Sequence, residues 1–199
     1  MKFILASKSP RRKELLADLY PNFEILTEAV DESLPKNLSL SAAVTVIAER
    51  KGRAVLDRLH KMRRPDLDEC IIISSDTMVE VSGVPLGKPK DEQDAYKMLS
   101  LLSGTEHSVH TGVAVFYRGS VISSVATTSV FFKKLSEREI LDYIKTGEPM
   151  DKAGAYGIQG GAGKFVEKIQ GDFDTVVGLS RSLTKELVER IISQTELKG

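Results

Sequence analysis

The chain has 199 residues and a mass of 21.9 kDa, and its 28 Lys and Arg residues balance 28 Asp and Glu residues. With no net charge, it lacks the basic field through which proteins bind nucleic acid polymers nonspecifically. A lone Cys70 excludes an internal disulfide, and no apolar stretch approaches the roughly 20 residues of a membrane span. The apolar run near the start of the sequence has only four residues, so we expect no secretion signal. We therefore expect a single cytoplasmic domain over residues 1–199, without a polymer or membrane partner.

The first half of the chain alternates strand and helix signals. Ser9 and Pro10 predict a helix start, because Ser is a favoured N-cap and Pro a favoured first helical residue. Leu40, Val44 and Ile47 recur at helical spacing and predict the apolar face of a second helix. In chain order we expect a strand over 3–6, a helix from Ser9, a helix over about 39–60, a surface loop over 61–69, and a strand over 71–73 that ends at 74–77.

The second half continues this alternation and inserts one hairpin. Ser136 and Glu139 have the spacing of a capping box, which predicts a helix start. In chain order we expect a helix capped by Asp91 and ended at Gly104, a hairpin over 108–132 that turns near Arg118 and Gly119, a helix from Ser136 to Gly147, strands over 165–169 and 175–177, and an amphipathic helix over 183–192. Interleaved strands and helices with one hairpin predict an α/β protein with a mixed sheet.

Two features of the sequence do not match familiar cofactor sites. The glycine-rich segment 154–163 has neither the spacing of a P-loop nor that of a dinucleotide-binding fingerprint. His107 and His110 are three residues apart in an expected strand and have no cysteine pair beside them, which disfavours a zinc site.

A basic cluster lies at the first strand-to-helix turn and consists of Lys8, Arg11, Arg12 and Lys13. Free N–H groups and the helix dipole favour an anion at such a turn, so the cluster indicates a phosphate site. The alternative is a solvated basic face on the first turn of the helix.

Carboxylates form a second set of candidates. Asp76 follows an apolar strand, and ligands bind outside the carboxyl ends of strands in open α/β sheets. Asp31 and Glu32 are adjacent in an expected loop and offer the hard oxygen ligands that Mg²⁺ accepts. The alternatives are an Asx turn at Asp76 and an ordinary pair of surface acids at 31–32.

Two lysines complete the pattern. Lys51 falls on the apolar stripe of the second helix, where a side chain that snorkels to solvent is the alternative, and Lys88 lies between Gly87 and Pro89. Cations for phosphate and carboxylates for a metal together indicate Mg²⁺-assisted chemistry on a small phosphorylated substrate.

Short motifs spread along the chain carry a more specific resemblance. In order they are Leu5-Ala6-Ser7 with Ser9-Pro10-Arg11-Arg12, Val30-Asp31-Glu32, Ala48 with Arg50-Lys51, Ser75-Asp76-Thr77, Gly87-Lys88-Pro89, Leu102-Ser103-Gly104, Thr111-Gly112-Val113, Gly147-Glu148-Pro149, residues 151–160, and Val176-Val177-Gly178-Leu179. With these motifs the chain resembles the Maf family of nucleoside triphosphate pyrophosphatases. The resemblance implies an elongated α/β fold similar to that of inosine triphosphate pyrophosphatases, with a mixed sheet flanked by helices and a central cleft between two lobes.

The resemblance also implies a reaction and roles for the candidate residues. A nucleoside triphosphate and water give the monophosphate and pyrophosphate, with a divalent metal, Mg²⁺ or alternatively Mn²⁺. By position Asp76 matches the proton acceptor for the attacking water, and Glu32 joins Asp76 as a metal ligand. Arg12 and the lysines Lys51 and Lys88 would face the triphosphate and offset charge on the leaving group.

Substrate choice follows from the same resemblance. The branch that acts on dTTP and UTP is similar to this chain at Arg11, Thr77 and Gln159, and a side-chain amide offers both a donor and an acceptor to the imide edge of these bases. The alternatives are a 7-methyl-GTP pyrophosphatase and a nucleotide-binding regulator of cell division with incidental hydrolysis. The family also suggests a homodimer. Ser180 and Lys8 depart from the family pattern, which has Pro and a small residue at these positions.

Overall fold

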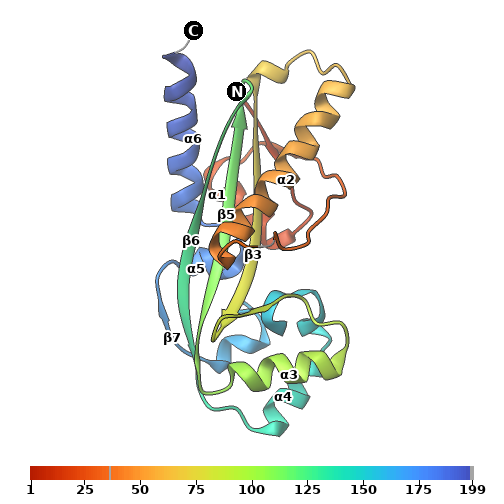
Figure 1. Ribbon diagram of the computed structural model, residues 1–199, viewed down its shortest axis with the longest axis vertical. Helices are drawn as coiled ribbons and strands as arrows, with labels where there is room; N and C mark the ends of the chain where they lie inside the picture. The colour runs from red at the N-terminus through yellow and green to blue at the C-terminus, as the bar shows by residue number, and fades with distance from the viewer. Residues whose placement is uncertain (36, 198–199) are drawn as a thin grey trace. The chain divides into compact units, whose positions relative to one another are not determined.

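A computed structural model describes residues 1–35 and 37–197 (Figure 1). The chain forms two compact units, and each is assembled from separated segments. Unit 1 comprises residues 1–76, 111–126 and 178–199, and unit 2 comprises residues 77–110 and 127–177.

A seven-stranded sheet has the strand order β2-β1-β3-β5-β6-β7, with β4 paired to β3. Its strands are β1 (Lys2–Leu5), β2 (Phe23–Ile25), β3 (Cys70–Val81), β4 (Val84–Leu86), β5 (Glu106–Tyr117), β6 (Ser120–Phe132) and β7 (Val166–Gln170). The α-helices are α1 (Pro10–Leu19), α2 (Leu40–Lys61), α3 (Glu92–Leu102), α4 (Glu137–Ile144), α5 (Phe173–Val177) and α6 (Arg181–Glu196). Short 3₁₀ helices cover Leu67–Glu69, Glu148–Asp151, Ala153–Ala155 and Gly161–Phe165. Strand β1 pairs in parallel with β2 and β3, whereas β4 and β7 pair antiparallel, which confirms the expected mixed sheet.

In unit 1 the helices cover both faces of the sheet. Helix α2 passes in front of β3 and β5, and α1 lies behind them in Figure 1. Apolar side chains of α2 and of the strands form a buried cluster that consists of Ile4, Ala6, Ala48, Val55, Leu56, Leu59, Cys70, Ile72, Ala114 and Phe116. Burial of this cluster is the main force that fixes α2 against the sheet.

The close approach of α2 to the sheet depends on Gly52. A Cβ atom at this position would collide with the ring of Phe116 and would lie 2.7 Å from the Ser74 hydroxyl. The Ser74 hydroxyl in turn donates a hydrogen bond to the Ala48 carbonyl at 2.7 Å. Only glycine therefore lets the helix backbone lie this near the strands, and the neighbouring residue Lys51 is placed with it.

In unit 2 aromatic rings occupy the centre of the core. Phe132 meets His107, Tyr156 and Phe165 edge to face, and Phe165 meets Tyr143 in the same way. The surrounding apolar residues come from β3 to β6, from α3 and α4, and from the segment that follows α4.

The structure corrects the expected elements at three places. Residues 175–177 belong to helix α5 and not to a strand, because the Asp172 carboxylate accepts hydrogen bonds from the Asp174 amide and the Thr175 hydroxyl and so favours a helical turn. The strand expected to end at 74–77 continues to Val81, and the turn after it leads into β4. Strand β2 was not expected from the sequence, and it pairs with β1 through only three residues.

No helix among residues 1–35 and 37–197 is long and apolar enough to cross a membrane.

Candidate functional site

Asp76 lies on β3, beyond the point where its parallel neighbour ends. The register of β1 against β3 runs from Lys2 opposite Cys70 to Leu5 opposite Ile73, and the Ala6 amide still bonds to the Ile73 carbonyl. The chain then leaves the sheet and begins α1, so that β3 continues without β1 beside it. Asp76 therefore does not end its own strand, as the sequence suggested, but lies outside the carboxyl end of β1, where α/β sheets bind ligands.

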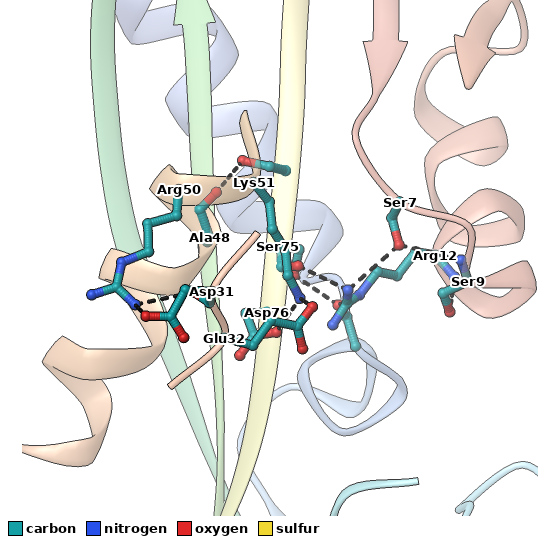
Figure 2. Close-up of polar contacts among 12 residues, drawn as sticks. Ser7, Ser9, Arg12, Asp31, Glu32, Ala48, Arg50, Lys51, Ser75 and Asp76 are labelled. Atoms are coloured by element: carbon teal, nitrogen blue, oxygen red, sulfur yellow. Dashed lines mark hydrogen bonds and ion pairs between the residues drawn. The ribbon is translucent and has the colours of Figure 1, made fainter. Parts of the chain in front are cut away.

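Lys51 joins the two candidate metal-binding carboxylates (Figure 2). Its ammonium group lies 2.7 Å from Asp76 Oδ1 and 2.9 Å from Glu32 Oε1. The Lys51 and Asp76 side chains are only 15% and 12% exposed, whereas the Glu32 side chain is 59% exposed. The alternative of a lysine that snorkels into solvent is therefore wrong, because the ammonium group is directed to a buried carboxylate.

Asp31 supports the loop that carries Glu32. Its carboxylate accepts hydrogen bonds from the Ser33 amide at 2.9 Å and from the Ser33 hydroxyl at 2.8 Å, and these bonds lower the pKa of Asp31. Arg50 of α2 donates to the backbone carbonyls of Asp31 and Ser33. Of the adjacent acids, Glu32 is thus the one that meets Lys51, and Asp31 shapes the turn.

Arg12 is held by oxygen atoms from separate parts of unit 1. Its Nε donates to the Gly178 carbonyl at 2.8 Å, and Nη1 donates to the Ser75 carbonyl at 2.8 Å and to the Ser7 hydroxyl at 3.5 Å. Burial lowers the pKa of the Arg12 guanidinium, and the nearby Asp76 carboxylate counteracts this effect. Arg12 therefore places a positive charge next to Asp76 and also ties the turn before α1 to β3.

The remaining basic residues of the turn differ from Arg12. Ser9 caps α1 as expected, with its hydroxyl accepting from the Arg12 amide. Arg11 is half-buried, and Lys8 and Lys13 are exposed. The basic cluster thus contains one inward-facing arginine and a solvated outer part.

Three predicted substrate-binding residues belong to unit 2. Thr77 is half-buried and directly follows Asp76 on β3. Lys88 is exposed in the segment between β4 and α3, where the Gly87 carbonyl accepts a hydrogen bond from the Gly154 amide. Gln159 is exposed in the turn between two 3₁₀ helices. The structure therefore brings Glu32, Lys51, Asp76 and Arg12 together within unit 1 and places Thr77, Lys88 and Gln159 in the other unit.

The family model described as "Maf-like protein" matches residues 2–191. The chain belongs to the Maf-like protein family. Known members include a "dTTP/UTP pyrophosphatase" of Bdellovibrio bacteriovorus, 47% identical over 94% of this chain and 97% of the relative, and one of Geobacillus sp., 47% identical over 96% and 98%. A third, from Yersinia pestis, is 44% identical over 98% of this chain and 95% of the relative.

Among solved structures, the chain is similar to the Staphylococcus aureus Ham1 protein, with a TM-score of 0.43 and 16% sequence identity over 66% of this chain and 72% of that chain.

The residues that hold Arg12 in this site could not be identified from their side-chain chemistry in the sequence. The Ser7 hydroxyl and the Ser75 and Gly178 carbonyls hold Arg12, and the Ser75 hydroxyl also donates to the Gly178 carbonyl at 2.9 Å. Each lies in a motif that carries the family resemblance, which was the available signal. Backbone carbonyls have no residue signature, so their role requires the folded chain.

The structure shows where the two departures from the Maf pattern, Ser180 and Lys8, lie. Ser180 is the N-cap of α6, where its hydroxyl accepts from the Leu183 amide at 3.3 Å. Serine at this position therefore begins the last helix by side-chain capping. Lys8 is exposed at the other departure.

Glu32 and Asp76 are the carboxylates of this site that could hold a divalent cation, because Mg²⁺ is typically bound by one or two carboxylates together with water and substrate phosphates. The Lys51 ammonium group contacts both carboxylates. Among residues 1–35 and 37–197 no group of three or more His, Cys, Asp and Glu side chains could hold a metal ion.

Proposed function

We propose that this protein is a nucleoside triphosphate pyrophosphatase that converts dTTP and UTP to the monophosphate and pyrophosphate. The names of its relatives support this substrate choice, and the buried pair of Lys51 and Asp76 carries the chemical part of the proposal. A carboxylate held in place by an ammonium group suits an enzyme that must accept a proton in a fixed position.

Asp76 is the proposed proton acceptor. A water molecule attacks phosphorus at the α,β-anhydride, its proton passes to an Asp76 carboxylate oxygen, and the anhydride P–O bond breaks to release pyrophosphate. Lys51 contacts Oδ1 of Asp76, which orients the carboxylate. A fixed orientation contributes to the rate because the base need not be ordered during the reaction.

Positive charge near Asp76 serves the phosphates. Arg12 and Lys51 already lie beside Asp76, and we assign Lys88 to the same triphosphate from the family motif. Glu32 and Asp76 would hold the divalent cation, Mg²⁺ or alternatively Mn²⁺. When bound, this cation neutralises phosphate charge that builds up on the leaving group.

Base selection is assigned to Arg11, Thr77 and Gln159. The Gln159 side chain is exposed and carries an amide that can both donate and accept a hydrogen bond. The imide edge of uracil or thymine needs such a combination, whereas cytosine presents an amino group in place of one carbonyl.

The test is pyrophosphate release from a panel of nucleoside triphosphates with Mg²⁺ or Mn²⁺, with Asp76→Asn as the control. We expect release from dTTP and UTP, and a fall in turnover on the order of 10²- to 10⁴-fold in Asp76→Asn. Thermal unfolding and nucleotide binding of the variant show whether it is folded. Release from 7-methyl-GTP alone would overturn the substrate choice, and nucleotide binding without turnover would favour a regulatory protein.

Two further properties belong to this proposal. We place the enzyme in the cytoplasm, where nucleoside triphosphates are made and used. We also propose a homodimer, by family analogy alone. Light scattering of the purified protein should then give about twice 21.9 kDa, and a mass equal to 21.9 kDa would contradict the dimer.

A further inference from the structure

The turn that carries Gln159 is fixed at both ends by one pair of side chains. The Tyr143 hydroxyl accepts a hydrogen bond from the Gly157 amide at 3.1 Å and donates one to Glu148 Oε1 at 3.0 Å. Glu148 Oε2 accepts from the Gly161 amide at 2.9 Å. Tyr143 and Glu148 therefore bridge the two sides of the turn, with Gln159 between them in the chain.

The contact between Glu148 and the turn is close enough to require glycine. A Cβ atom on Gly160 would collide with the Glu148 carboxylate, and one on Gly157 would lie 3.0 Å from Glu148 Oε1. Glu148 is itself restrained, because the Lys152 ammonium group donates to its backbone carbonyl at 2.7 Å. The carboxylate thus lies against the backbone of the turn, and Gln159 extends to the surface.

The residue before the turn is anchored in the core of unit 2. Tyr156 is 5% exposed, and its hydroxyl lies 2.8 Å from Nε2 of the buried His107. Burial lowers the pKa of His107 to about 4, so the imidazole is neutral at physiological pH. Among the described residues, Nδ1 of His107 has no hydrogen-bond partner, so the imidazole is held by the hydrogen bond between Nε2 and the Tyr156 hydroxyl.

From these contacts we propose that Tyr143 and Glu148 are positioning residues for base selection. They hold the turn over 157–161 in one conformation, so that the Gln159 amide meets the pyrimidine already ordered. This inference rests on the proposed pyrophosphatase function. It assigns no contact with the nucleotide to Tyr143 or Glu148, and both act through the backbone of the turn.

The physical reason is preorganisation. If the turn were mobile, the exposed glutamine would lose conformational entropy on binding, and its amide could turn to bond with other bases as well. Two hydrogen bonds hold the Gly157 and Gly161 amides before substrate arrives, and a third joins the Tyr143 hydroxyl to the Glu148 carboxylate. Their loss should therefore raise KM and reduce discrimination, with little effect on kcat.

The test compares Tyr143→Phe and Glu148→Gln with a matched control, Glu139→Gln. Tyr143→Phe keeps the ring packed on Phe165 and removes only the hydroxyl. Glu139 is also a carboxylate of unit 2 that accepts a backbone hydrogen bond, from the Ser136 amide at 2.9 Å, but it caps α4 and does not contact the turn. The control therefore weakens the start of α4, the helix that carries Tyr143, without removing a hydrogen bond to the turn.

For each protein we would measure kcat and KM for dTTP and dCTP, together with thermal unfolding. In Tyr143→Phe and Glu148→Gln we expect KM for dTTP to rise about tenfold and the preference for dTTP over dCTP to fall about tenfold, as for loss of a buried hydrogen bond. Glu139→Gln should lower the unfolding temperature and leave that preference unchanged. An unchanged preference in both test variants would overturn the inference.

Amide hydrogen exchange gives a readout independent of turnover. The Gly157 and Gly161 amides should exchange faster in Tyr143→Phe and Glu148→Gln than in Glu139→Gln. Equal exchange in all variants would show that the pair does not hold the turn. A wild-type protein without turnover of dTTP would overturn the proposed function and this inference together, whereas wild-type turnover with an unchanged preference in the test variants would overturn this inference alone.

Discussion

The two units position their functional side chains in different ways. In unit 1 Lys51, Asp76 and Arg12 are fixed by direct contacts of their own charged groups, with little exposure of Lys51 and Asp76. In unit 2 Gln159 is exposed and is placed by the backbone of its turn, which Tyr143 and Glu148 hold. Under the proposed function, chemistry and recognition are therefore secured separately, by charge pairing in one unit and by backbone support in the other.

This difference has a physical basis. A general base must keep its charge and direction, and a buried ion pair with further hydrogen bonds provides both. A group that reads a base must remain free to bond with its ligand, so its own side chain cannot be occupied in the free protein. Support for such a residue has to come from its backbone.

The largest effect is expected from a substitution that breaks the charge pairing of unit 1. Lys51→Met keeps the length and the apolar stem of the side chain and removes the ammonium group between Asp76 and Glu32. We expect turnover of dTTP to fall on the order of 100-fold, because both the base and the phosphates lose a fixed charge. Steady-state kinetics would measure this, with Lys185→Met as a control, since Lys185 lies on the exposed face of α6. Similar turnover in the two variants would contradict the assignment.

The next effect is a pH dependence of stability that arises from His107 in unit 2. His107 is neutral when buried, and burial lowers its pKa from 6.5 to about 4. The unfolded chain binds this proton at higher pH than the folded chain, so stability is full above pH 6.5 and declines as the pH falls toward 4. Each pKa unit is worth about 1.4 kcal/mol, which gives a loss of about 3 kcal/mol.

Denaturant unfolding between pH 7 and pH 4 would check this dependence. In His107→Phe the ring remains in the aromatic cluster but cannot titrate, so its stability should change less over this range than that of the wild type. Parallel curves for the two proteins would refute the role of His107.

A smaller effect tests how the helix places Lys51. Gly52→Ala introduces a Cβ atom into the contact of α2 with Phe116 and Ser74. We expect a loss of about 1 to 3 kcal/mol in the free energy of unfolding, as for other overpacked sites, and reduced turnover because Lys51 moves with the helix. Chemical denaturation and dTTP kinetics measure the two consequences. A stable variant with reduced discrimination between dTTP and dCTP would be inconsistent with the separation of roles.

The smallest effect concerns the first turn of α6, where Ser180 itself makes no contact with the proposed functional side chains. Ser180→Ala removes the N-cap of α6 and should cost about 1 kcal/mol in the free energy of unfolding. Turnover and base preference should stay at wild-type values after correction for the folded fraction. A Ser180→Thr variant, which restores a capping hydroxyl without adding a charge to this buried position, should recover most of the loss. Failure of this recovery would indicate that the hydroxyl has another role.

Local features of the fold could be predicted from the sequence. Ser9 and Ser136 begin helices as their neighbours in the sequence indicated, because a cap depends only on residues within one turn. Residues 175–177 were assigned to a strand from their β-branched composition, and the Asp172 side chain favoured a helix instead. Intrinsic preference was overridden by a nearby hydrogen-bond acceptor.

The candidate site was predictable in part. Asp76, Glu32 and Lys51 carry their chemistry in their side chains, and the structure brings these residues together from β3, a loop and α2. The contacts of Tyr143 and Glu148 with the turn over 157–161 were not predictable. They join side chains to backbone amides, and only the folded chain places such groups within hydrogen-bond distance.

The most direct test of separate roles is the ratio of kcat/KM for dTTP to that for dCTP, measured in wild type, Lys51→Met and Gln159→Ala. We predict that Lys51→Met loses turnover on both nucleotides and keeps the wild-type ratio, whereas Gln159→Ala keeps most of its kcat and loses about tenfold of the ratio. A changed ratio in Lys51→Met, or an unchanged one in Gln159→Ala, would contradict the account.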